Sequence, residues 1–85
     1  MSIYAIYLNG SDENSWKLVR EKWPERHFIL DDRLAFVAPT ETTTTQDIAE
    51  NVALDDKGGL VFNWSAYGGF NSRKLWEWLA KVESE

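Results

Sequence analysis

Every residue from Ile3 to Leu8 is apolar. Side chains alternate between the two faces of a β-strand, so an extended segment of this composition is apolar on both faces. Such a segment predicts a central strand that is covered by other elements on each side. It is also the longest uninterrupted apolar run of the chain, far shorter than the roughly 20 residues that a membrane-spanning helix needs.

The chain has 85 residues, which predicts one domain spanning residues 1–85. A domain of this size buries only about 60% of the surface that its unfolded chain exposes. It has no cysteine, so neither disulfides nor thiolate metal sites can stabilise it. It has instead five Trp, four Phe and three Tyr, and each large ring buries roughly 150–250 Å² when it packs. We therefore expect an aromatic core, to which dimerisation could add.

The first helix is predicted by an apolar stripe of Trp16, Val19 and Trp23. Ser11 is the expected N-cap, with acidic residues next to it at the positive end of the helix. Pro24 ends the helix, because the residue before a proline avoids the helical conformation.

The next segments predict two strands, a helix and a further strand. Residues 27–30 and 34–38 are expected to form a hairpin around the short polar turn 31–33. The second helix is expected at about 46–54, with Thr43 and Gln46 as its capping box, and Thr44 with Asp47 as a looser alternative. Residues 60–64 predict the fourth strand.

A last helix is predicted to begin after a cap at Asn71 or Ser72 and to bury Leu75, Trp76, Leu79 and Val82. The complete order, β-α-β-β-α-β-α, predicts an α+β fold. Specifically, we expect a ferredoxin-like βαββαβ sandwich with an antiparallel four-stranded sheet and an extra C-terminal helix. In such a sheet the first and third strands are central.

The charge of the chain limits its partners. Nine Lys and Arg residues stand against fourteen Asp and Glu residues, a formal net charge of −5. An acidic domain repels phosphate backbones, so nucleic acid is not a favoured partner. No basic, apolar and small-residue pattern of a signal peptide occurs at the N-terminus, so a cytoplasmic location is expected.

No set of residues predicts catalysis, a cofactor or a metal site. The pairs Asp31-Asp32 and Asp55-Asp56 could bind a cation, but both fall in predicted turns, where Asp is favoured by its local hydrogen bonds. His27 is the single histidine, and no nucleophile accompanies it, so we expect a structural role.

The aromatic residues are the most informative feature for function. Trp76 and Trp78 lie about 200° apart on a helix, and Tyr4 and Tyr7 point to opposite faces of their strand. Part of this aromatic surface must therefore lie outside one core. Either the last helix covers it or it forms an interface, where Trp and Tyr are enriched. The candidate binding residues are Tyr4, Phe36, Tyr67 and Trp78.

Three segments resemble small bacterial proteins with the fold of the CRISPR-adaptation endonuclease, the second of the Cas proteins, and of VapD-type RNases. They are Tyr4 to Leu8, Leu30 to Val37, and Gly69-Phe70 to Leu79. The resemblance is strongest to members with a Trp-rich ending. It implies a metal-dependent nuclease with an aspartate at the end of the first strand. Leu8 and Asn9 stand at that point here, and Asp12 is the nearest carboxylate, so Asn9 and Asp12 are the alternative metal ligands.

The same order of elements is similar to that of RNA-recognition motifs. Ile3 to Leu8 resembles their first-strand signature, and Arg33 to Val37 resembles a degraded form of their third-strand signature. This resemblance implies that bases stack on Tyr4 and Phe36, exposed together on an open sheet face.

We expect a non-catalytic interaction or regulatory module that acts as a homodimer through an aromatic-rich face. The alternatives are a metal-dependent endonuclease and an RNA-binding module.

Overall fold

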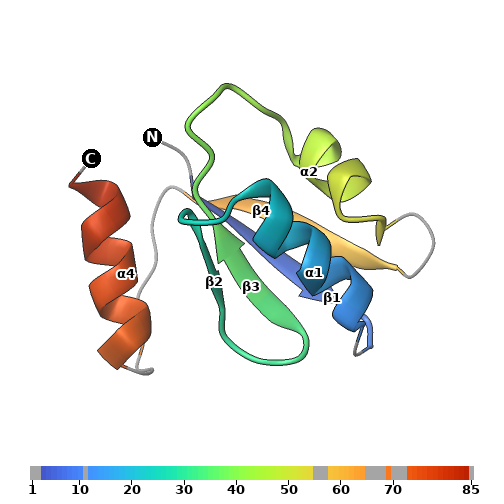
Figure 1. Ribbon diagram of the computed structural model, residues 1–85, viewed down its shortest axis with the longest axis horizontal. Coiled ribbons are helices and arrows are strands. Elements are labelled where there is room, and N and C mark those ends of the chain that lie inside the picture. Colours follow the sequence, from blue (N-terminus) through green and yellow to red (C-terminus); the bar gives the residue numbers. More distant parts are fainter. Residues whose placement is uncertain (1–2, 11, 55–57, 65–68, 70–72, 85) are drawn as a thin grey trace.

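The structure is a computed structural model that describes residues 3–10, 12–54, 58–64, 69 and 73–84. These residues form an α+β fold around one four-stranded antiparallel sheet, whose strand order is β2-β3-β1-β4 (Figure 1). The elements are β1 (Ile3–Leu8), α1 (Glu13–Lys22), β2 (His27–Ile29), β3 (Leu34–Val37), α2 (Thr45–Asn51), β4 (Gly59–Trp64) and α4 (Arg73–Glu83). The predicted class and the antiparallel sheet are confirmed, and β1 and β3 are the central strands.

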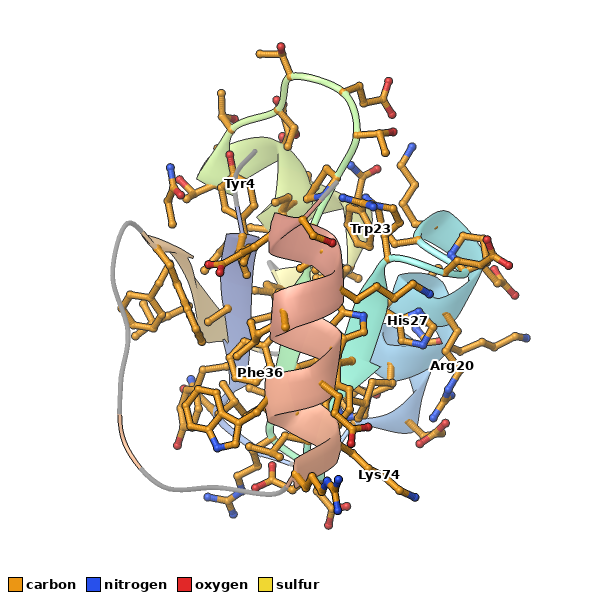
Figure 2. All side chains as sticks on the ribbon, turned by 90° about the vertical axis from the view of Figure 1, so that its left-hand side faces the viewer. Tyr4, Arg20, Trp23, His27, Phe36 and Lys74 are labelled. Carbon is orange, nitrogen blue, oxygen red and sulfur yellow. The ribbon has the colours of Figure 1, made fainter. Side chains whose placement is uncertain are left out.

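Both faces of β1 are covered, as its composition predicts, except at Tyr7, which is exposed. Helices α1 and α2 lie on one side of the sheet and α4 lies on the other (Figures 1 and 2). Tyr4, Ile6 and Leu8 belong to the cluster beneath α1 and α2. Ile3 and Ala5 belong to a second cluster beneath α4. The sheet therefore separates two hydrophobic cores.

The N-cap of helix α1 lies one residue later in the chain than expected. The N-cap is Asp12, whose Oδ1 accepts a hydrogen bond from the Asn14 backbone N–H at 3.1 Å; the predicted cap, Ser11, lies outside the described residues. The stripe of Trp16, Val19 and Trp23 is buried, as predicted. The Trp16 indole Nε1 also donates to the Asp32 carbonyl at 2.7 Å, which ties α1 to the turn between β2 and β3.

The capping box of α2 is formed by Thr44 and Asp47, so our preference for Thr43 and Gln46 was wrong. Thr44 Oγ1 accepts from the Asp47 N–H at 3.1 Å, and Asp47 Oδ2 accepts from the Thr44 N–H at 3.2 Å. The Thr43 carbonyl accepts instead from the Tyr4 hydroxyl at 3.0 Å. The helix ends at Asn51, earlier than predicted.

The turn between β2 and β3 is held by Asp31, as its position in the sequence predicts. Asp31 Oδ1 accepts from the backbone N–H groups of Arg33 at 2.8 Å and Leu34 at 3.0 Å. This is the local bonding for which Asp is favoured in turns. The second pair, Asp55-Asp56, lies outside the described residues.

Helix α4 buries Leu75, Leu79 and Val82 against the sheet, while Trp76 is only half-buried. Its two predicted caps, Asn71 and Ser72, lie outside the described residues. Within the described part of the chain, no helix combines the length and apolar character that crossing a bilayer requires.

Replacing Trp16 or Trp23 by alanine should remove a large part of the stability of the domain. Both side chains are buried in the core beneath α1. A buried Trp→Ala change costs about 3–5 kcal/mol, while a small domain has only about 5–15 kcal/mol of stability in total. Urea denaturation followed by circular dichroism measures the loss. Lys17→Ala, on the exposed side of the same helix, is the control and should change stability by less than about 0.5 kcal/mol. Unchanged midpoints for both Trp variants would contradict the packing of α1.

Candidate functional site

Three large hydrophobic side chains are exposed among the described residues. Tyr7 on β1 is 37% exposed, and Leu60 and Phe62 on β4 are 56% and 50% exposed. The pairing of β1 with β4 sets Tyr7 opposite Leu60 and Ala5 opposite Phe62. Side chains of paired residues share a face of the sheet, and Ala5 belongs to the cluster beneath α4. Tyr7, Leu60 and Phe62 therefore form one apolar surface, called here the β4 surface, on the α4 side of the sheet.

The placement of α4 explains why this surface is left open. Trp78 on α4 packs against Phe28 on β2, with ring centroids 6.1 Å apart. The helix thus lies over the central strands and β2, and β4 lies to one side of it (Figure 2). Ala5, opposite Phe62, is too small to cover that ring. Trp64, at the end of β4, is partly buried because it packs edge-on against Phe36, with centroids 4.8 Å apart.

Strand β4 is also an edge of the sheet. Its sequence from Gly59 to Trp64 contains no charged residue and no proline. Proteins usually protect an exposed edge strand with charge, proline or short length, because its free backbone groups can pair with another strand. The opposite edge, β2, is only three residues long. The sheet therefore has one protected edge and one that lacks these protections.

Tyr4 and Phe36 are not brought together. Tyr4 is 4% exposed and lies in the core beneath α1 and α2, whereas Phe36 is 3% exposed and lies in the core beneath α4. The cause is the register: Tyr4 pairs with Val37, and Phe36 pairs with Ala5. Neighbouring positions along a strand face opposite sides. The exposed stacking pair that the RNA-recognition resemblance implies is therefore absent, and these two predicted binding residues are core residues.

Trp78, a third candidate binding residue, does not add to this surface. Trp78 is half-buried against Phe28, and its buried indole Nε1 has no hydrogen-bond partner among the residues that the structure describes. Tyr67 lies outside the described residues. The last helix thus covers part of the aromatic surface, as the first of the two explanations above predicts.

Of the two alternative metal ligands, Asp12 has a structural role. Asp12 caps α1 through Oδ1, and its Oδ2 lies 3.3 Å from the Ser15 hydroxyl. Asn9 is exposed, and its backbone N–H donates to the Gly58 carbonyl at 3.2 Å. Among the described residues, no three His, Cys, Asp or Glu side chains come close enough to hold a metal ion. His27 Nδ1 lies 2.5 Å from the Trp23 carbonyl, so it donates a structural hydrogen bond.

A shallow hollow of about 400 Å³ lies at the C-terminal end of α1. Its lining is mixed in charge, with Lys22, Arg26, Glu25 and Glu41 around Trp23. The Arg26 Nε donates to the Ala38 carbonyl at 2.6 Å, which fixes the end of β3. The hollow is therefore lined by charged groups of both signs around one indole ring.

Comparison with protein-family models, curated proteins and solved structures finds no match for this chain. The resemblance to the CRISPR-adaptation endonuclease and VapD-type RNases therefore stays a prediction. The β4 surface is the site that the structure itself brings together. The sequence predicts a strand at residues 60–64, but Leu60 and Phe62 were not among the candidate binding residues. The absence of charge and proline from this strand was the signal that could have selected them.

Asp12→Ala should lower stability by about 1 kcal/mol, because it removes the N-cap of α1. Asp12→Asn should retain most of that stability, since the Asn side chain also accepts a hydrogen bond.

Wild-type protein should show no heat of Mg²⁺ binding in calorimetry and no cleavage of labelled DNA or RNA with Mg²⁺ or Mn²⁺. Metal-dependent cleavage that both Asp12 variants abolish would instead establish a nuclease site.

Proposed function

We propose that this chain is a non-catalytic interaction module that acts as a homodimer through the β4 surface. The observation that carries the proposal is the contiguous exposure of Tyr7, Leu60 and Phe62 in an otherwise acidic domain. Aromatic side chains are enriched at protein interfaces. The proposal also specifies the topology of the fold, a ferredoxin-like βαββαβ sandwich. It places the protein in the cytoplasm. The strand order β2-β3-β1-β4, with α1 and α2 on one face, supports that topology.

Burial of these side chains supplies a reason for association. Fully burying a Leu or Phe side chain that was exposed contributes about 1.5–3 kcal/mol. Leu60 and Phe62 are each about half exposed in the single chain, so roughly half of that remains to be gained. In a symmetric dimer the same surface is used by both copies, so each side chain contributes twice. Binding to a second copy of the chain therefore buries both sets of exposed side chains at one interface.

The acidic charge and the burial of Tyr4 and Phe36 direct the proposal away from nucleic acid. A net charge of −5 opposes binding to phosphate backbones. The two aromatic residues that would stack on bases are enclosed in separate cores. The apolar β4 surface carries no charge with which to bind phosphate.

Sedimentation at micromolar concentration should give a mass about twice that of the 9.8 kDa chain. Phe62→Lys should shift the protein to monomer, because it places a charge in the centre of the β4 surface. Asn51→Lys adds the same charge at an exposed position on α2 and should leave the dimer intact.

A clean monomer up to about 100 μM would contradict the proposal, since it corresponds to association weaker than about −5.5 kcal/mol. Equal dissociation by Phe62→Lys and Asn51→Lys would locate the interface elsewhere.

A further inference from the structure

We infer that two copies join through their β4 strands, paired antiparallel about a two-fold axis at Val61, so that their sheets become one continuous sheet. This inference rests on the proposed homodimer and specifies how its interface is built.

The hydrogen bonds of β1 show which backbone groups of β4 are free. The Leu8 N–H donates to the Arg33 carbonyl at 2.8 Å, toward β3, and the Asn9 N–H donates to the Gly58 carbonyl at 3.2 Å, continuing the pairing with β4. In antiparallel pairs the bonding direction alternates along the strand. The N–H and C=O groups of Leu60 and Phe62 therefore face β1.

The same alternation turns the N–H and C=O groups of Gly59, Val61 and Asn63 toward the outer edge. Strand β4 is the last strand of the sheet, so no other strand in the described part of the chain bonds to these groups. Backbone groups that face an open edge are a template for a further strand.

One register satisfies all three outward-facing residues. With the two-fold axis at Val61, the two Val61 residues exchange hydrogen bonds, and Gly59 exchanges them with Asn63 of the second copy. With the axis at Phe62, Gly59 would face a residue beyond the end of the second strand. The register centred on Val61 thus makes the fullest use of the edge.

This register also covers the exposed apolar side chains. Leu60 lies directly opposite Phe62 of the second copy, and the symmetry repeats that contact on the other side of the axis. These positions are a non-hydrogen-bonded pair, in which Cα atoms approach to about 4.5 Å and side chains contact closely. The half-exposed Leu60 and Phe62 are thereby packed against each other on the α4 side of the sheet.

The charge distribution favours a second copy as the occupant. Each chain carries a net charge of −5, yet Gly59 to Trp64 contains no charge. Two acidic copies can therefore meet along β4 without placing like charges opposite each other. A strongly charged partner would find no complementary group on this strand. The short β2 edge, with Arg26 and Asp31 flanking it in the sequence, offers no comparable neutral strip.

A pair of single-cysteine variants tests the register, since the chain has no cysteine of its own. Under mild oxidation, Val61→Cys should form a disulfide-linked dimer, because hydrogen-bonded residues have Cα atoms about 5.5 Å apart, within disulfide range. Asn63→Cys is the matched control on the same strand. Its two copies would lie about 14 Å apart along the strands, at about 3.4 Å per residue, and should stay unlinked.

Sedimentation of the unmodified protein separates the two proposals. If it is a dimer and Val61→Cys is not linked faster than Asn63→Cys, the β4 pairing is wrong while the homodimer stands. If it is a monomer, both proposals fail. Circular dichroism must show that each variant is folded. Should Val61→Cys be unfolded, a mixture of Leu60→Cys and Phe62→Cys, both at exposed positions, replaces it. With the two variants in equal amounts, mixed disulfides should then exceed the share that random pairing of the copies gives, and a share equal to or below the random one would overturn the register.

Discussion

The double burial of β1 is the constraint on which the rest of the structure depends. Tyr4, Ile6 and Leu8 enter the core beneath α1 and α2, while Ile3 and Ala5 enter the core beneath α4. A strand that is apolar on both faces is stable only where layers cover it on each side. It therefore takes a central position between β3 and β4. This short chain has no disulfides. It has two hydrophobic cores, one on each face of the sheet, and β1 contributes side chains to both.

Features set by local sequence could be predicted, and features set by distant contacts could not. The stripe of Trp16, Val19 and Trp23 and the Asp31 turn follow from spacing and from turn chemistry. The cap of α2 was misplaced because successive threonines allow two frames. The structure uses Thr44, and the carbonyl of the neighbouring threonine accepts from Tyr4, 39 residues away. That contact is not contained in the local sequence.

The candidate site shows the same division. The alternation of β4 predicts that Leu60 and Phe62 share a face, but not that this face is open. The exposure of Leu60 and Phe62 depends on where α4 crosses the sheet. The contact between Trp78 and Phe28 holds that helix toward β2. The amphipathic pattern of α4 identifies its buried side without specifying its position. An uncharged edge strand beside an uncovered apolar face is thus a consequence of tertiary packing, and it links the fold to the proposed function.

Amide hydrogen exchange of the unmodified protein, measured at low and high concentration, tests this link most directly. Because β1 already bonds to alternate residues of β4, the N–H groups of Leu60 and Phe62 should be protected at both concentrations. The N–H groups of Gly59, Val61 and Asn63 should exchange rapidly in dilute protein and become protected as the concentration rises. Protection of these three amides that does not change with concentration, or that rises along β2 instead, would contradict association through β4.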